Sequence, residues 1–173
     1  MKNLHLFLTV LALFIFSCSS DNENSSSTLP ISESQGINAS INGGSFNNYN
    51  FSDSIYQVTK GANNTISIDA SDTNGNQITL FLNSTGGFSS GTIKDMGDID
   101  SNNFVTYILL RQGNPEVSYF SSTGTVTITK NRAHPTDSGL QLLSGTFEIT
   151  ANPINDPTTI TIAGSFVELE FED

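Results

Sequence analysis

The chain has few side chains with reactive chemistry. Its 173 residues include a single cysteine, Cys18, two histidines, His5 and His134, and no tryptophan. One cysteine excludes an internal disulfide, and two histidines leave little material for a catalytic triad or a multi-histidine metal site. His134 lies in the turn-like stretch Asn131–Gly139, so we expect it to be an exposed loop residue. Carbohydrate-binding β proteins usually stack sugars on exposed aromatic rings, and tryptophan is missing from that set here.

Positive charge is also scarce. Six lysines and arginines stand against 17 aspartates and glutamates, and the formal net charge is −11. A surface of this sign repels phosphate backbones and anionic lipid headgroups, so we expect no nucleic-acid partner and no direct electrostatic contact with a membrane. The acidity also serves to keep a surface protein soluble.

Long apolar runs are missing except at the start, where Leu4–Phe16 follows one lysine and ends at Ser17 and Cys18. This run is shorter than the roughly 20 residues that cross a bilayer, and its order is typical of a secretory signal. The segment resembles the signal of a bacterial lipoprotein, because Ile15–Cys18 fits the loose lipobox pattern. The resemblance implies that residues 1–17 are removed and that Cys18 is lipidated. The mature protein would then have a membrane partner through its acyl chains and no free thiol.

The segment 18–36 is rich in Ser, Asn, Asp and Glu and shows no periodicity. We predict a disordered tether, about 25 Å long as a coil and about 60 Å when stretched. Its acidic start, Asp21–Glu23, resembles the export signal of lipoproteins of the Bacteroidota. That resemblance implies display on the outer face of the outer membrane, and retention on the periplasmic face is the alternative.

Residues 37–173 have the size of one domain and show period-two alternation broken by Gly and Asn clusters, with no helix signal. About nine or ten strands are expected. The predicted fold class is all-β, a single antiparallel β-sandwich of immunoglobulin-like or jelly-roll-like type, with a closed antiparallel β-barrel as the alternative.

Two hairpins are predicted from the alternation. Thr65–Ala70 and Ile78–Leu82 are joined by a turn at Asn74 and Gly75, and Gly124–Lys130 pairs with Leu140–Ala151. A last strand, Thr158–Glu172, changes the parity of its apolar residues, and we expect a bulge at Ala163–Ser165. The segment Phe104–Leu110 is apolar on both faces, so we place it in the middle of the structure, covered on both sides.

Four short motifs resemble those of small, uncharacterised lipoprotein domains of the Bacteroidota: Ile41–Gly43, Gly124–Thr129, Ser144–Thr150 and Ile160–Phe166. In that family an Ile-Asn-Gly start precedes Gly-Thr-hydrophobic strands and a Gly-Ser-Phe end. The resemblance implies a β fold and a surface or periplasmic location. It offers no catalytic residues.

The densest group of oxygen ligands lies between Asp95 and Asn103. Its carboxylate and amide candidates are Asp95, Asp98, Asp100 and Asn102, and the last three are spaced like the first ligands of a calcium loop. Asn103 then replaces the glycine of that loop, and Leu109 replaces its glutamate. We therefore expect a solvated strand connection and no cofactor, with Ca²⁺ bound in another geometry as the alternative.

Carboxylates also gather near the end of the chain. Glu168, Glu170 and Glu172 share one face of the last predicted strand, and Glu148 points outward from the preceding one. Paired carboxylates are what glycoside hydrolysis requires. We expect Glu148 to lie opposite about Thr161, seven residues from Glu168, so a solvated face is the favoured interpretation.

Three further groups of residues are candidate binding or modification sites at the surface. Seven threonines are predicted to point outward from three strands as a regular array, which also follows from strand propensity alone: Thr125, Thr127, Thr129, Thr146, Thr150, Thr159 and Thr161. Tyr49, Tyr56 and Tyr119 are the sugar-stacking candidates, each expected to be half-buried. Asp53–Ile55 resembles the site at which exported Bacteroidota proteins are O-glycosylated, which would make Ser54 the acceptor.

The sequence thus predicts a non-enzymatic cell-envelope lipoprotein whose β domain binds a glycan or a protein partner, or has a structural role. A glycan-directed hydrolase using the carboxylates is one alternative. A calcium-stabilised adhesin module is the other.

Overall fold

The computed structural model describes residues 34–173, so the predicted signal, Cys18 and most of the tether lie outside the described residues. The described chain is all-β, which confirms the predicted class. One 3₁₀ turn, η1 (Ala62–Asn64), is its only helical element, and no described helix is long and apolar enough to cross a membrane. The strands are β1 (Gly36–Gly43), β2 (Phe46–Ser52), β3 (Ile55–Gly61), β4 (Thr65–Ser71), β5 (Gln77–Leu82), β6 (Ile93–Asp95), β7 (Tyr107–Gln112), β8 (Val117–Ala133), β9 (Leu140–Pro153) and β10 (Ile160–Glu172).

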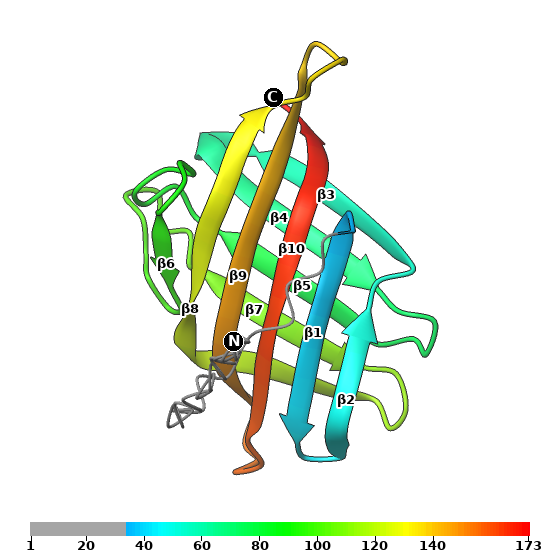
Figure 1. Cartoon of the computed structure of the whole chain (residues 1–173). Coiled ribbons are helices and arrows are strands. Elements are labelled where there is room, and N and C mark those ends of the chain that lie inside the picture. The colour runs from blue at the N-terminus through cyan, green and yellow to red at the C-terminus, as the bar shows by residue number, and fades with distance from the viewer. Residues whose placement is uncertain (1–33) are drawn as a thin grey trace, which may run out of the picture.

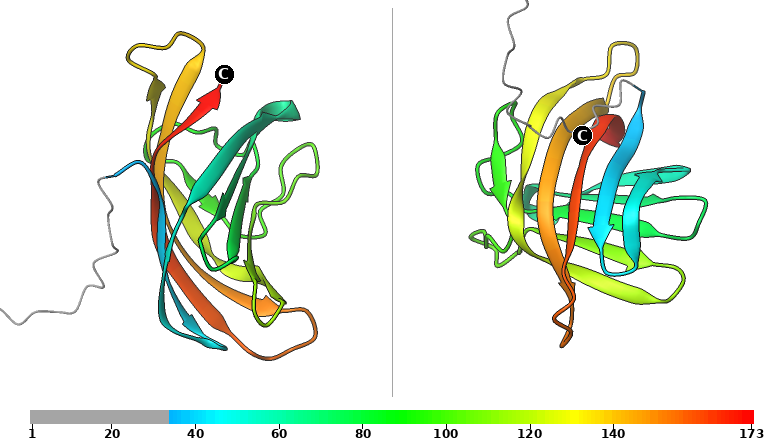
Figure 2. Two further views of the ribbon diagram at one scale, coloured as in Figure 1. Left: turned by 90° about the vertical axis from the view of Figure 1, so that its right-hand side faces the viewer. Right: turned by 60° about the horizontal axis from the view of Figure 1, so that its bottom comes forward.

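The strands form one antiparallel sheet in the order β2-β1-β10-β9-β8-β7-β5-β4-β3, and β6 pairs with β8 off this path. The sheet curls into a half-barrel (Figure 1). The front layer holds β2, β1, β10, β9 and most of β8 as steep strands, and β3, β4, β5 and β7 cross behind it. Figure 2 shows the two layers edge-on in its left-hand view.

The chain passes between the layers at two corners. At the first, Asp53 N–H donates to Ile37 O in β1, whereas Ser54 N–H donates to Ser71 O in β4, so pairing changes layer between consecutive residues. At the second, the start of β8 pairs with β7 and its later part pairs with β6. A bulge between Ser121 and Thr123 bends β8 there. Strands that switch layers through a bend or a bulge are how orthogonally packed sheets are joined.

The core lies between the two layers, because each layer turns one face of its alternating strands inward. The hairpin of β4 and β5 pairs as predicted, with Ile68 opposite Leu80 and both fully buried. The hairpin of β8 and β9 is also confirmed, with Val126 opposite Phe147. Gly75, at the first turn, has φ of +81°, which glycine adopts without strain.

Two glycines make room for aromatic rings inside this core. Gly145 pairs with Phe166, and Gly164 pairs with Phe147, across β9 and β10. A Cβ on Gly145 would lie 2.3 Å from Cζ of Phe166, and a Cβ on Gly164 would lie 2.7 Å from Cζ of Phe147. The Ser-Gly-Thr-Phe and Ala-Gly-Ser-Phe motifs of the sequence are therefore packing motifs in which each ring covers the facing glycine.

The bulge in the last strand lies later than predicted. Phe166 is still on the inward parity of Ile160 and Ile162, and the register shifts between Phe166 and Leu169, not at Ala163–Ser165. Glu168 has φ of +48° at the shift, and its N–H donates to Ser144 Oγ at 2.9 Å. The predicted position was wrong because the small residues there serve close packing rather than a bend.

Beyond the bulge, β10 and β3 approach each other and narrow the half-barrel. Their backbones do not pair in the described chain, and side chains join them instead. Gln35 Nε2 donates to Tyr56 Oη at 2.8 Å, to Glu168 O and to Glu170 Oε1. Near the C-terminal ends of β3 and β10, Lys60 forms an ion pair with Asp173.

Candidate functional site

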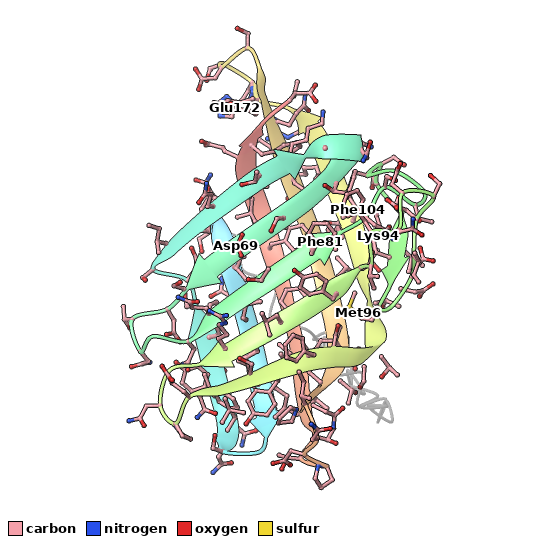
Figure 3. All side chains as sticks on the ribbon, turned by 180° about the vertical axis from the view of Figure 1, so that it is seen from behind. Asp69, Phe81, Lys94, Met96, Phe104 and Glu172 are labelled. Carbon is pink, nitrogen blue, oxygen red and sulfur yellow. The ribbon has the colours of Figure 1, made fainter. Side chains whose placement is uncertain are left out.

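The outward side of the rear layer carries the most distinctive surface of the described chain. We call it the back face: the outward side chains of β3, β4, β5, β7 and the start of β8 (Figure 3). Strand register arranges them in rows. The middle row holds Gln57, Asp69, Thr79, Leu109 and Phe120. The row nearer the first corner holds Ile55, Ser71, Gln77, Arg111 and Ser118.

Aromatic rings form one part of the back face. Phe81 and Tyr107 pair across β5 and β7, and their rings stack with centroids 5.5 Å apart and planes 16° from parallel. Phe104, in the loop before β7, packs against Phe81 with the two ring centroids 6.0 Å apart. Tyr107 is 37% exposed and Phe120 is 40% exposed. We call Phe81, Phe104, Tyr107 and Phe120 the aromatic strip.

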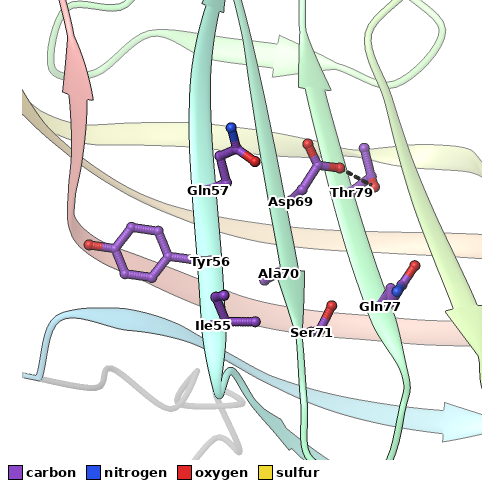
Figure 4. Close-up of a pocket in the computed structure, with 8 residues that line it drawn as sticks. All are labelled: Ile55, Tyr56, Gln57, Asp69, Ala70, Ser71, Gln77 and Thr79. Carbon is purple, nitrogen blue, oxygen red and sulfur yellow. Dashed lines mark hydrogen bonds between the residues drawn. The ribbon is translucent and has the colours of Figure 1, made fainter.

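Polar side chains form the part beside it. A hollow of about 420 Å³ is lined by Ile55, Tyr56, Gln57, Asp69, Ala70, Ser71, Gln77 and Thr79 (Figure 4). Asp69 accepts hydrogen bonds from Thr79 Oγ1 at 2.6 Å and from Ser67 Oγ at 3.1 Å. A second hollow, of about 510 Å³, shares Gln77 and extends past Arg111 and Glu116.

The aromatic strip and the polar groups beside it can contact different parts of a sugar. The face of an aromatic ring packs against the C–H groups of a sugar ring, and the Tyr hydroxyl adds a polar handle. Amide, carboxylate and guanidinium groups supply donors and acceptors for sugar hydroxyls. Asp69, held by two hydroxyls, and the neighbouring Gln57 and Gln77 lie within the same open surface as the aromatic strip. The back face is therefore suited to an extended, hydroxyl-rich ligand.

Sequence reasoning missed this surface. Phe104–Leu110 was expected to be covered on both sides, and this was wrong: Ile108 and Leu110 are buried, but Val105 and Tyr107 face outward and are exposed. The signal that could have found it is the pairing of Tyr107 with Phe81, since two outward aromatics on adjacent strands indicate a surface cluster. Of the three tyrosines considered instead, Tyr49 and Tyr56 are half-buried as expected, Tyr119 is not, and only Tyr56 borders the first hollow. Tyr119 is buried, Tyr49 donates to Asp72, and Tyr56 accepts from Gln35 at the seam with β10.

The acidic loop after β6 is organised by its own backbone. Asp100 accepts hydrogen bonds from the N–H groups of Asn102 and Phe104 with one oxygen and from Ser84 with the other. Burial alone would raise the pKa of Asp100, but these hydrogen bonds lower it overall. Asp95, Asp98, Asp100 and Asn102 are not gathered around one point, and the described residues contain no cluster of three or more His, Cys, Asp or Glu side chains able to hold a metal ion.

Lys94 lies beneath this loop and is only 2% exposed. Its ammonium group donates to Asn83 O at 2.8 Å and to Thr85 O, and lies 4.2 Å from the ring centroid of Phe88. Burial lowers the pKa of Lys94 to about 8, against the opposing influence of the Asp98 and Asp100 charges. The side chain therefore ties the loop that follows β5 to β6.

The terminal glutamates lie on the outer surface and have structural partners. Glu168 accepts from Arg132 at 2.9 Å and from Lys130 at 3.1 Å, and these bonds lower its pKa, the reverse of what a general acid needs. Glu170 accepts from Gln35 and lies 3.8 Å from His134 Nε2. Glu172, at the end of β10, is exposed.

Two details of this region differ from expectation. Glu148 faces Ala163 rather than Thr161, which still leaves it roughly 15 Å along the strand from Glu168, beyond the spacing of hydrolytic carboxylate pairs. His134 was expected to be exposed, but its side chain is 15% exposed, because the ring packs beside the turn that it caps, with Nδ1 accepting from Asp137 N–H.

The threonine array and Ser54 are at the surface. Thr125, Thr127, Thr146, Thr150 and Thr161 alternate with buried neighbours and face outward from the front layer, as expected. Ser54 is exposed at the first corner, and its hydroxyl donates to Ser71 O at 3.0 Å. Its glycosylation stays a prediction.

Comparisons with protein-family models, with curated proteins and with solved structures gave no match. The features of this protein that bear on its function are therefore the geometry of the back face and the predicted membrane anchor.

Proposed function

We propose that this protein is a lipid-anchored, non-enzymatic binding module of the cell envelope, carried on the outer membrane, and that its back face binds a neutral glycan chain. Lipidation at Cys18 supplies the attachment, and the tether holds the β domain away from the headgroups. The domain itself is an incompletely closed, orthogonally packed barrel rather than a sandwich of two separate sheets, since Asp53, Ser54 and β8 carry the pairing from one layer to the other.

The observation that carries the proposal is the stacked pair Phe81 and Tyr107 beside the hydrogen-bonding row of Asp69 and Thr79. A protein interface would also use aromatics, but its centre is depleted of charged groups. Here the carboxylate of Asp69 lies beside the aromatic strip on a shallow surface. Aromatic rings beside hydrogen-bonding groups match the C–H faces and the hydroxyl groups of a glycan.

The negative charge of the protein favours neutral glycans over anionic ones. The whole chain carries net −11, and Asp69 and Glu116 line the two hollows. Polyanionic polysaccharides are repelled by such a surface over about one Debye length, roughly 8 Å at physiological salt. A neutral chain meets no such barrier, so the preferred ligand is a neutral polysaccharide.

The test is affinity electrophoresis or calorimetry of the purified full chain with a panel of neutral and anionic polysaccharides. Tyr107→Ala is expected to weaken binding to the best neutral polysaccharide about tenfold, because loss of an aromatic contact of about 1–1.5 kcal/mol changes affinity by that factor. Thr161→Ala, on the exposed face of the front layer, is the matched control and should bind like the unchanged protein. Thermal melting of both variants checks that they fold.

Two results would contradict the proposal. One is equal binding by the Tyr107 and Thr161 variants. The other is breakdown of the bound glycan that disappears in Glu170→Gln, which would establish the hydrolase alternative.

A further inference from the structure

A further concavity is lined by residues of β3, β4, β8, β9 and β10 and of the loop after β5. It lies at the end of the half-barrel where Figure 1 marks the C-terminus. We call it the mouth pocket. Its volume is about 380 Å³, within the range of small-molecule sites, and barrel mouths are a common place for such sites. It shares no lining residue with either hollow of the back face.

The floor of the mouth pocket is apolar and fixed. Ile66, Phe88 and Phe171 line it and are each less than a tenth exposed. Phe88 comes from the loop after β5, and the Lys94 ammonium group 4.2 Å from its ring centroid helps to hold the ring in place. The floor is therefore preformed, and it presents only a small part of these side chains to a ligand.

The walls break the inward apolar pattern of their strands. Asn131 pairs with Leu143, and Gln141 pairs with Phe171, so both amides share the inward side of buried residues. Directly below, the inward positions of β8 are apolar, as at Ile128. At this open end of the half-barrel the inward side is not covered, so Asn131 is exposed and Gln141 is half-buried, and both amides are open to solvent and to a ligand.

The polar groups of the pocket are available to a ligand. Neither Asn64 nor Asn131 makes a side-chain hydrogen bond within residues 34–173, and Gln141 makes one long bond, at 3.4 Å, to Asp173. Lys60 and Asp173 form an ion pair, so the side-chain charges of the lining cancel. Each free amide offers donors and an acceptor at once, which matches hydroxyl groups that do the same.

From these observations we propose that the mouth pocket binds a neutral polyhydroxylated molecule of monosaccharide or disaccharide size. The apolar side of the ligand rests on the small exposed part of Phe88 and Phe171, and its hydroxyls bond to Asn64, Asn131 and Gln141. A phosphate or carboxylate ligand would meet Asp173 with no unpaired cation in the lining to offset it. This site is separate from the back face and does not depend on it.

The test is an NMR titration of the full chain, labelled with ¹⁵N and kept in a detergent without sugar headgroups. The probes are glucose, galactose, mannose and N-acetylglucosamine with their disaccharides, and glucuronate and glucose-6-phosphate as charged counterparts. We expect saturable shifts of the side-chain amide signals of Asn64 and Asn131 with at least one neutral sugar. The charged counterparts should bind at least tenfold more weakly.

Asn131→Leu separates binding from folding, because leucine restores the inward apolar pattern beside Leu143. Its thermal midpoint should equal or exceed that of the unchanged protein, while sugar affinity, followed at the Asn64 amide, falls about tenfold or more. Asn50→Leu, an exposed Asn on β2, is the matched control and should leave affinity unchanged, as should Tyr107→Ala. The proposal is overturned if no neutral sugar shifts these amides, if charged sugars bind as well, or if Asn131→Leu binds normally.

Discussion

At the scale of single residues, Lys94 shows how a buried charge is tolerated when it organises loops. The side chain lies almost fully buried, yet every contact it makes suits a cation: two backbone carbonyls and one aromatic face. Those carbonyls belong to the loop after β5 and would otherwise lack this donor. The lysine therefore stabilises the loop despite the desolvation of its charge, and the balance between the two effects depends on pH.

The pH dependence of this balance can be predicted. The pKa of Lys94 falls from its ordinary value near 10.4 to about 8 in the folded protein. Below pH 8 both states hold the proton and the full desolvation penalty is present; between about pH 8 and 10.4 the unfolded state binds more protons, so this group makes stability rise with pH. The free energy of unfolding, measured by denaturant at successive pH values, should therefore rise relative to Lys94→Met across that window.

Lys94→Met is the reference because it keeps the length of the side chain and removes the titration. It should be less stable at every pH, since Asn83 O and Thr85 O lose their donor, by about 1–3 kcal/mol per acceptor left unsatisfied. A constant difference between the two proteins from pH 7 to pH 10 would show that the lysine keeps an ordinary pKa.

The residues of the back face show why sequence patterns located some side chains and not others. Ile66, Ile68 and Val126 are buried, as the alternation within their strands indicates, because period two follows directly from strand geometry. The same alternation left Tyr107 ambiguous, since both parities of Phe104–Leu110 carry apolar residues. Only the register of β7 against β5 shows that it lies beside Phe81, and register depends on contacts distant in sequence.

At the scale of strands, the paired glycines and phenylalanines of β9 and β10 determine how closely the two strands pack. A Cβ at Gly145 would lie 2.3 Å from the Phe166 ring and 2.6 Å from Thr127 O. Gly145→Ala is therefore expected to lower the free energy of unfolding by about 2–3 kcal/mol, as overpacking of a core does. Urea unfolding measures this directly.

Two comparisons make the glycine result specific. Gly61→Ala is the comparison for a clash with one side chain alone, because a Cβ there lies 2.5 Å from Thr65 Oγ1 and no other atom lies closer than 3.9 Å, so its loss should be the smaller one. In a Phe166→Leu background the loss from Gly145→Ala should shrink by about 1 kcal/mol, since the ring edge is removed. An equal loss in both backgrounds would assign the effect to backbone crowding by Thr127 alone.

The bulge of β10 marks the limit of sequence reasoning at this scale. A parity change was predictable because Ile162 and Leu169 cannot share a face in a regular strand. Its position was not, because Glu168 is held in its positive φ by partners on other strands: Ser144 on β9, and Lys130 and Arg132 on β8. Those contacts are separated from Glu168 by 24 to 38 residues, beyond any local pattern.

At the scale of the whole molecule, the fold class could be predicted from the sequence and the two proposed binding surfaces could not. The all-β class and the predicted membrane attachment follow from composition and from the first 18 residues. The back face depends on the register of neighbouring strands. The mouth pocket arises only when the sheet curls, because curling brings Lys60 and Phe171, far apart in the chain, into one lining. A function that depends on curvature leaves little trace in a single sequence.

The membrane anchor predicted at Cys18 determines the cell fraction in which the protein is found. If Cys18 carries the lipid, the unchanged protein should sediment with membranes, and Cys18→Ser should move it to the soluble fraction, because a chain without acyl groups keeps no durable attachment. Recovery of the unchanged mature protein in the soluble fraction, with Cys18 unmodified, would refute the anchor. Fractionation followed by mass spectrometry of the N-terminal peptide reads out both results.

The side of the membrane then decides which glycans the back face can meet. Treatment of intact cells with a protease should remove the protein while a periplasmic control survives. The protease must have broad specificity, because residues 19–36 contain no lysine or arginine for trypsin. Loss of the protein would direct the ligand search to extracellular polysaccharides. Protection would instead place the domain in the periplasm, where the neutral glycans available are those of the envelope itself, and a role in envelope assembly would then be the stronger interpretation.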